Sequence, residues 1–196
     1  MILKREFYQQ PTLDVAKSLL GKKLVRQQSK KKLIGLIVET EAYIGENDTA
    51  CHASKGKTQR TEIMFGRAGH AYVYFIYGLH YMLNIVTETE NNPAAVLIRA
   101  IQPLNHIDIL RQHRNVSNER LLTNGPAKLC QAYNINKTLN GFDLCLGREL
   151  WIEAGDEHND YQIETSPRIG IDYAEENDRN AHWRFTLKDN PFLSKH

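Results

Sequence analysis

LIGLIVETEAYI, from Leu33 to Ile44, is a long apolar segment that carries two acids near its end. Its β-branched and aromatic residues predict a strand. Alternation with period two divides this strand into two faces, one with Ile37, Glu39, Glu41 and Tyr43 and the other with Val38, Thr40 and Ala42. Because ionised carboxylates are seldom buried without partners, the first face should line a solvated cleft or a salt-bridge network. An edge strand with both acids in water is the alternative.

The rest of the chain supplies further strands and a few helices. The predicted strands span residues 22–26, 71–77, 81–87, 95–101, 150–153, 162–164, 168–172 and 183–188. The predicted helices span residues 12–20, 107–114 and 126–133, with Thr12 as a cap, Gly21 ending the first helix in a left-handed conformation and Pro126 in a first turn. No repeat or linker divides the sequence. We expect the α+β class, one compact domain over residues 1–196 with a mixed, mostly antiparallel sheet flanked by short helices.

Composition sets limits on the class of protein. The chain has 196 residues, of which 41% are hydrophobic and 24% charged, the balance of a soluble globular protein. The apolar run at 71–85 is interrupted by polar residues and is too short to span a membrane. The charged start at 1–7 argues against secretion, so we expect a cytoplasmic, nucleoid-associated or nuclear protein. Cys51, Cys130 and Cys145 lie too far apart for a paired metal knuckle or a disulfide framework.

Charge is distributed unevenly although the net charge is only +2. Residues 1–32 carry nine Lys and Arg against two Asp and Glu, whereas residues 141–181 carry three against eleven. A basic face opposite an acidic one would bind phosphates electrostatically, and an ordinary solvated charged surface is the alternative.

Aromatic residues are concentrated in AYVYFIYGLHYMLN, residues 71–84. Tyr72 and Tyr74 share one face of the predicted strand, while Tyr77 lies beside Gly78 at a predicted turn. A bulky ring at a tight turn can wedge between base pairs and fill the gap left by an extruded nucleotide. Core packing is the alternative for each tyrosine. We expect two further rings of this stretch in the core, those of Phe75 and Tyr81.

The chemistry of the first strand depends on a possible partner for its acids. Arg99 lies in the otherwise apolar segment AVLIRAI, and a buried guanidinium requires an anion, for which Glu41 or Glu39 would serve. Glu41 is also two residues from Tyr43 on the same face. That placement indicates a general base beside a stacking surface.

Two other polar residues have a functional and a structural interpretation. His52 lies in the basic and polar loop CHASKGKTQR, which is suited to phosphate contact. It would contact a sugar or phosphate oxygen, stack against a base, or be an exposed loop histidine. Asn84, within MLNIV, needs hydrogen bonds for its amide. It would discriminate the edge of a base or make a structural hydrogen bond.

Taken together, these segments resemble the alkyladenine, or 3-methyladenine, DNA glycosylases, also called methylpurine glycosylases. The resemblance is carried by IVETEAY at 37–43, a histidine nine residues beyond Tyr43, YVYFIYG at 72–78, Asn84, LIRA at 97–100, GPAKLCQA at 125–132, INK at 135–137 and RIGI at 168–171. Several blocks in order across nearly the whole chain are far more specific than any one motif.

The resemblance implies a DNA-repair hydrolase of base-excision repair that acts on double-stranded DNA. It would flip out a damaged purine such as 3-methyladenine, hypoxanthine or ethenoadenine. Glu41 would deprotonate a water that Arg99 and the backbone carbonyl of Ile169 help to hold. The resemblance also implies the base-binding residues, with Tyr43, His52 and Tyr74 enclosing the flipped base, Asn84 screening its edge and Tyr77 filling the vacated stack. It implies neither a metal nor an organic cofactor.

Several further expectations complete this hypothesis. The implied site contains no lysine, which argues against a Schiff-base lyase step and for hydrolysis that leaves an abasic site. We expect a monomer without membrane contact, and we expect Glu39 to be structural. Basic residues outside the site would contact the DNA backbone, namely Arg60, Lys128 and Lys137.

Two other functions compete with this one. A metallohydrolase would gather a divalent ion among Glu39, Glu41, His52, His70 and His80, although their spacings match no compact ligand motif. Its activity would be lost with a chelator. A non-catalytic module that binds DNA or RNA would keep every function after Glu41→Gln.

Overall fold

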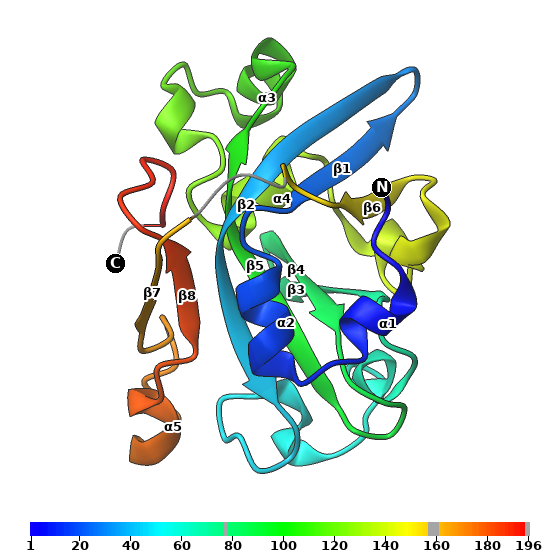
Figure 1. Cartoon of the computed structure of the whole chain (residues 1–196), viewed down its shortest axis with the longest axis vertical. Helices are drawn as coiled ribbons and strands as arrows, with labels where there is room; N and C mark the ends of the chain where they lie inside the picture. Colours follow the sequence, from blue (N-terminus) through cyan, green and yellow to red (C-terminus); the bar gives the residue numbers. More distant parts are fainter. Residues whose placement is uncertain (77, 157–160, 195–196) are drawn as a thin grey trace.

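The strand that carries the two acids lies in the middle of the sheet (Figure 1). The computed structural model describes residues 1–76, 78–156 and 161–194. Strands follow the order β3-β4-β5-β2-β1-β6, and β8 pairs with both β2 and β7. Their bounds are Lys23–Gln28 for β1, Lys31–Ile44 for β2, Ala71–Ile76 for β3, His80–Val86 for β4, Ala94–Pro103 for β5, Leu150–Glu153 for β6, Ile163–Ser166 for β7 and Arg184–Leu187 for β8. These pairings are antiparallel.

β2 has 14 residues and is therefore long enough to pair with two strands in succession along the same edge. β5 pairs with residues 35–44, while β1 pairs with residues 31–36 and β8 with residues 39–41. Because a strand has only two edges, β1 and β8 occupy the edge opposite β5 in succession. This arrangement brings the C-terminal strands β7 and β8 beside the acids of β2 (Figure 1).

The pairing of β2 with β5 is irregular where the acids begin. Its register shifts between Ile37 and Glu39 and again between Glu39 and Thr40. Such a bulge interrupts the alternation of side chains. Ile37 and Val38 both lie in the apolar core, and the expected grouping of Ile37 with Glu39 on one face stays a prediction.

Helices cover the sheet on both sides. Figure 1 shows α2 (Thr12–Ser18) in front of it and α4 (Pro126–Ala132) behind it, with α3 (Ile107–Arg114) packed against α4. The remaining short helices are α1 (Arg5–Tyr8), α5 (Glu176–Asn180), η1 (His52–Lys55), η2 (Glu62–Phe65), η3 (Glu119–Leu121), η4 (Lys137–Leu139) and η5 (Leu144–Leu146). Within the described ranges, no helix has the length and apolarity that crossing a membrane would need.

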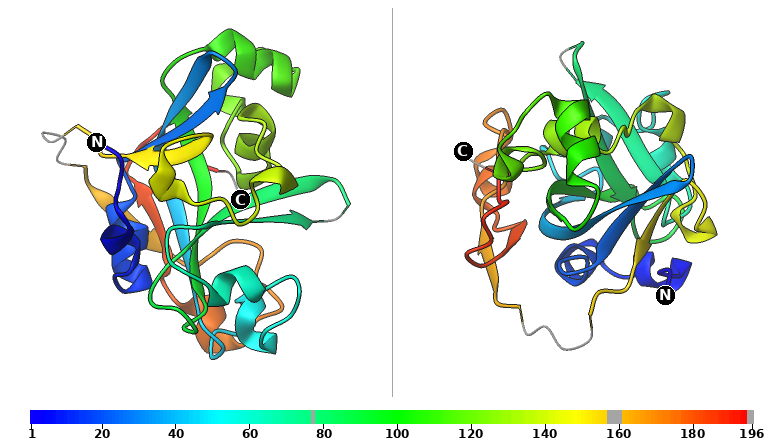
Figure 2. Two further views of the ribbon diagram at one scale, coloured as in Figure 1. Left: turned by 90° about the vertical axis from the view of Figure 1, so that its right-hand side faces the viewer. Right: turned by 90° about the horizontal axis from the view of Figure 1, so that it is seen from above.

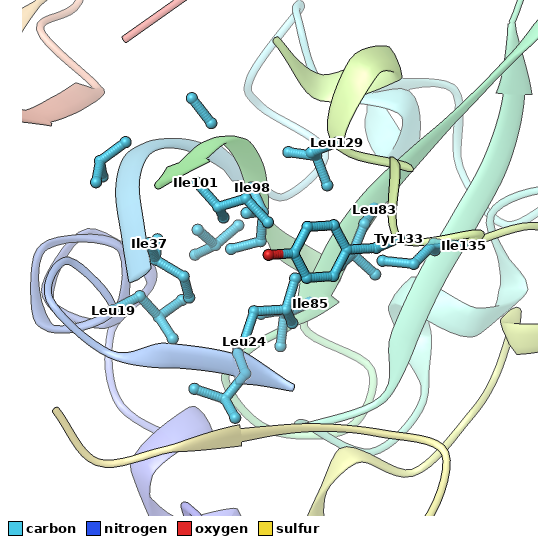
Figure 3. Close-up of a cluster of buried hydrophobic side chains, with 14 of the residues drawn as sticks. Leu19, Leu24, Ile37, Leu83, Ile85, Ile98, Ile101, Leu129, Tyr133 and Ile135 are labelled. Atoms are coloured by element: carbon cyan, nitrogen blue, oxygen red, sulfur yellow. The ribbon is translucent and has the colours of Figure 1, made fainter. Parts of the chain in front are cut away.

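One large apolar cluster joins these layers (Figure 3). Leu24 of β1, Ile85 of β4 and Ile98 of β5 meet Leu129 of α4 and the fully buried Tyr133 that follows that helix. α2 reaches the same cluster and is docked by a buried hydrogen bond, in which the Thr40 hydroxyl donates to the Ala16 carbonyl at 2.8 Å.

The α+β class is confirmed, and the predicted strands other than 168–172 match observed ones within two residues at each described end. The helix at 107–114 is as predicted, and Pro126 begins α4. Gly21 has the predicted left-handed conformation, with φ of +79°. α2 ends at Ser18, however, and the predicted cap is wrong, because the Thr12 hydroxyl is 2.9 Å from that of Thr87 instead.

Two further expectations are wrong. The segment at 168–172 is a loop instead of a strand, with Gly170 at φ of +75°. Phe75 is not in the core, because 49% of it is exposed, and it pairs with the ring of Tyr81 at 4.8 Å. The cause is that the β3–β4 hairpin extends away from the rest of the protein (Figure 2), so its outer residues have no layer above them.

Replacing Thr40 by valine should destabilise the protein. Valine keeps the shape of the side chain but removes the hydroxyl that donates to the buried Ala16 carbonyl. Leaving that carbonyl without this donor costs about 1–3 kcal/mol of folding free energy. Urea unfolding measures the change in free energy. The matched control is Thr165→Val on the exposed strand β7, where the change should stay within about 0.5 kcal/mol. Equal stabilities of the two variants would contradict the docking role of Thr40.

Candidate functional site

Both acids of β2 are fully buried, and Glu39 binds several donors. Its Oε1 accepts hydrogen bonds from Arg99 Nε at 3.1 Å, Arg184 Nε at 2.7 Å and the Ser194 hydroxyl at 2.7 Å. Its Oε2 accepts one from the Ser194 backbone N–H at 2.7 Å. Four donors therefore bind the Glu39 carboxylate, three of them at Oε1 and one at Oε2. It connects β2 to β5, β8 and the C-terminal segment, which supports the structural role expected for it.

Glu41 has three donors instead of four. Its Oε2 accepts from Arg99 Nη1 at 3.2 Å and from the Tyr43 hydroxyl at 2.8 Å, and its Oε1 accepts from the Ile169 backbone N–H at 2.8 Å. Among the described residues no second donor binds Oε1, which leaves one of its acceptor positions open. The predicted pairing of Arg99 with an acid is confirmed, and this guanidinium bridges both carboxylates. For Ile169, the contact with the carboxylate is through the amide, and the role of its carbonyl stays a prediction.

The environment of Glu41 changes its protonation. Burial raises the pKa of this carboxyl above its ordinary value, and Glu39 acts in the same direction. Arg99, the Ile169 N–H and the Tyr43 hydroxyl oppose the increase because they stabilise the ionised form. Burial and the neighbouring carboxylate also raise the pKa of Tyr43, so its phenol stays protonated and can donate.

An aromatic group lies beside this carboxylate. The rings of Tyr72 and Tyr74 share one face of β3, as predicted, with centroids 5.3 Å apart. The His52 ring meets the Tyr74 ring edge-on at 4.6 Å, and its Nδ1 is 3.0 Å from the Tyr72 hydroxyl. Tyr43 packs against the same cluster while its hydroxyl binds Glu41, so it connects the aromatic group to the acid.

Arg60 lies on this aromatic group. Its guanidinium is 5.2 Å from the centre of the Tyr74 ring, and its Nη2 is 3.3 Å from His52 Nε2. A guanidinium only donates, so His52 Nε2 accepts and Nδ1 carries the hydrogen that it donates to Tyr72. Burial, Arg60 and Lys55 lower the pKa of His52 to about 4, which leaves the ring neutral near pH 7. Contact of Arg60 with the DNA backbone stays a prediction.

The other predicted site residues lie at various positions. Asn84 is buried opposite Tyr72 in the β3–β4 register, and its amide donates to the Tyr72 carbonyl at 3.4 Å. Its role at the edge of a base stays a prediction. Lys128 lies on α4 with its Nζ 2.9 Å from Asn124 Oδ1, and Lys137 is exposed at the start of η4. The predicted intercalating residue, Tyr77, lies outside the described residues.

The residues named for a metal site are separated. His70 lies with Arg5, whose Nη1 is 3.4 Å from its Nδ1, and His80 is exposed at the start of β4. Across residues 1–76, 78–156 and 161–194, no group of three His, Cys, Asp or Glu side chains is placed to hold a metal ion.

The sequence interpretation missed four residues that build this site, namely Asp48, Arg168, Arg184 and Ser194. Arg168, like Arg99, is an arginine beside apolar residues, which indicates a buried guanidinium that needs an acid. The strand predicted at 168–172 did not identify that acid. Asp48 and Arg168 are 120 positions apart, so spacing alone does not pair them.

Comparison with known proteins identifies relatives along the whole chain. The sequence model described as Methylpurine-DNA glycosylase (MPG) matches residues 6–191. A protein of Alkaliphilus oremlandii named "Putative 3-methyladenine DNA glycosylase" is 52% identical over the full length of both chains. Proteins of the same name from Methanocella arvoryzae and Borrelia garinii subsp. bavariensis are 51% and 45% identical, covering 99% and 98% of this chain and 96% and 100% of their own. The chain therefore belongs to the methylpurine-DNA glycosylase family.

Proposed function

We propose that this protein is a monofunctional DNA glycosylase of base-excision repair that removes damaged purines from duplex DNA. It hydrolyses the N-glycosidic bond with a water activated by Glu41 and leaves an abasic site. Membership of the family supports the reaction class. The observation that carries the assignment to Glu41 is the difference between two buried acids on one strand: Glu39 binds four donors, whereas Glu41 binds three and is joined through Tyr43 to the aromatic group.

The open position on Glu41 Oε1 suits an attacking water. Three donors fix the carboxylate, so the remaining lone pair has a defined direction toward which a water can donate. A base with a raised pKa is also better matched to proton transfer near neutral pH than an ordinary carboxylate. Arg99 and the Ile169 carbonyl would help to hold that water.

The same carboxylate can serve both steps of the chemistry. Cleavage of a glycosidic bond passes through an oxocarbenium-like state, which a nearby negative charge stabilises while water attacks the anomeric carbon. Burial strengthens this effect because the interaction takes place in a medium of low polarity. The donors on Glu41 are a phenol, a guanidinium and an amide, and none of these is an amine nucleophile that would form a Schiff base.

The aromatic group would receive the flipped base. Tyr43, His52 and Tyr74 would enclose it, with Asn84 at its edge and Tyr77 in the vacated stack. The position of Tyr43 supports this arrangement, since its partly exposed ring would place the base next to the carboxylate that its hydroxyl binds. Alkylated purines such as 3-methyladenine carry a positive charge and gain cation–π attraction from these rings. Hypoxanthine and ethenoadenine would enter as neutral bases.

DNA itself would be held by basic side chains around the site. Arg60, Lys128 and Lys137 would contact phosphates, and affinity should then fall steeply with salt. Arg60 would leave the Tyr74 ring for the DNA backbone, because its guanidinium covers the surface that the base would use. We propose that the protein works as a monomer without a metal or an organic cofactor.

Glu41→Gln should abolish excision while lesion binding is kept. Glutamine has the same shape but cannot take a proton from water, so the single-turnover rate should fall by at least about 100-fold. The assay uses duplexes with hypoxanthine, ethenoadenine or a methylated purine, with chelator present, followed by alkaline cleavage of abasic sites. Gel shift on the same duplexes measures binding.

The matched control for this substitution is Glu164→Gln on β7, where the side chain is exposed and the rate should not change. Wild-type excision by Glu41→Gln would show that another group activates the water. If the wild-type protein bound lesions but excised none of them, it would be a binding module instead.

The pH dependence of excision should report Glu41. Because the pKa of this carboxyl is raised and the base must be ionised, the rate should rise with pH through a midpoint above the ordinary glutamate value of 4.5 and be lost below it. A permanently cationic methylated purine is the suitable substrate, since its departure needs no protonation. A midpoint at or below 4.5 would argue against Glu41 as the base.

A further inference from the structure

A separate buried ion pair lies behind the site. The Arg168 side chain has no exposed surface, and its two terminal nitrogens bind both oxygens of Asp48, Nη1 to Oδ2 at 2.6 Å and Nη2 to Oδ1 at 2.8 Å. Asp48 is completed by two backbone amides, those of Ile44 at 3.0 Å and Ala50 at 3.1 Å. This pair therefore fixes the turn that follows β2 as well as the guanidinium.

The same guanidinium contacts the elements around Glu41. Arg168 Nη1 donates to the Ala42 carbonyl at 2.9 Å, between Glu41 and Tyr43, and Nη2 donates to the Asp178 carbonyl at 3.1 Å. Its centre lies 4.8 Å from the Tyr43 ring and 4.8 Å from the Trp183 ring. Arg168 thus supports the face of Tyr43 and holds β2 against α5.

Ile169 depends on this arrangement because it follows Arg168 directly in the chain. Its N–H donates to Glu41 Oε1, yet the segment at 168–172 is a loop, so no strand ladder sets the position of that amide. Gly170 at φ of +75° turns the chain away immediately afterwards. The buried side chain of Arg168 therefore anchors the chain directly before the Ile169 N–H, which donates to Glu41 Oε1.

We propose that the Arg168–Asp48 pair is the positioning unit of the active site. It places the Ile169 amide on Glu41 and supports the Tyr43 ring, and it acts through these groups without touching the substrate. This inference rests on the proposed role of Glu41 as general base. Neither Asp48 nor Arg168 carries out a chemical step.

A positioning role and a purely stabilising role differ in their effect on Glu41. If the loop at 168–172 moves, the ionised carboxylate loses the Ile169 donor and becomes easier to protonate. The charged or titratable groups that act on Glu41 are Glu39 and Tyr43 on β2, Tyr74 on β3, Arg99 on β5 and the Arg168 guanidinium itself. Variants that keep the charge of the pair leave these charges in place, so a change in the acid midpoint reports a change in geometry.

Arg168→Lys keeps the positive charge but cannot make the two-pronged contact or the stacking. We expect the acid midpoint of the excision profile to move up by about one pH unit, which is about a tenfold loss of rate on the acid side. Asp48→Glu also keeps its charge and displaces the carboxylate by one methylene, so it should move the midpoint in the same direction. It provides the test if Arg168→Lys does not fold.

The matched control is Arg5→Lys. Arg5, on α1, forms an ion pair with Asp143, and neither residue belongs to the elements that surround Glu41. It should lower the melting temperature and leave the acid midpoint unchanged. The proposal is overturned if folded Arg168→Lys or Asp48→Glu behaves in the same way as this control. Failure of the proposed function is a separate result, since it would appear as excision by Glu41→Gln.

Discussion

Among the described residues, three carboxylates lie buried, and three arginines lie against them. Glu39, Glu41 and Asp48 are each exposed by 2% or less, and they meet Arg99, Arg184 and Arg168. Removing one member of such a set would leave an uncompensated buried charge, which costs about 3–5 kcal/mol. The arrangement therefore determines how β2, β5, β8 and the loop at 168–172 come together, since each supplies one or more of these charges.

Within this network the two acids of β2 have different surroundings and hence different roles. Glu39 binds four donors that connect β2 to β5, β8 and the C-terminal segment, whereas Glu41 binds three donors, one of which is the Tyr43 hydroxyl. The Tyr43 hydroxyl and the Ile169 amide stabilise the ionised form of Glu41 and so partly offset the effect of its burial. Tyr43 also packs against the aromatic cluster, so one side chain connects the proposed base pocket to the carboxylate.

Much of this arrangement follows from the sequence. The β-branched strands are located correctly because a buried sheet demands such residues, and Arg99 in an apolar strand indicated an acid as its partner. The bulge at Val38 and Glu39 could not be predicted, because it depends on the register between β2 and β5. The pairing of Arg168 with Asp48 joins two irregular segments far apart in the chain. Phe75 is exposed because the β3–β4 hairpin extends beyond the rest of the protein. The local sequence pattern does not predict how far a hairpin extends.

We propose that burial, which its three donors only partly offset, makes Glu41 a stronger base than an ordinary carboxylate. Carbon-13 NMR titration of glutamate side-chain carboxyls in the DNA-free protein measures this directly, with the Glu41 signal assigned by its absence in Glu41→Gln. The account predicts that this one signal titrates above 4.5, the ordinary glutamate value. A Glu41 signal that titrates at or below that value would contradict the account.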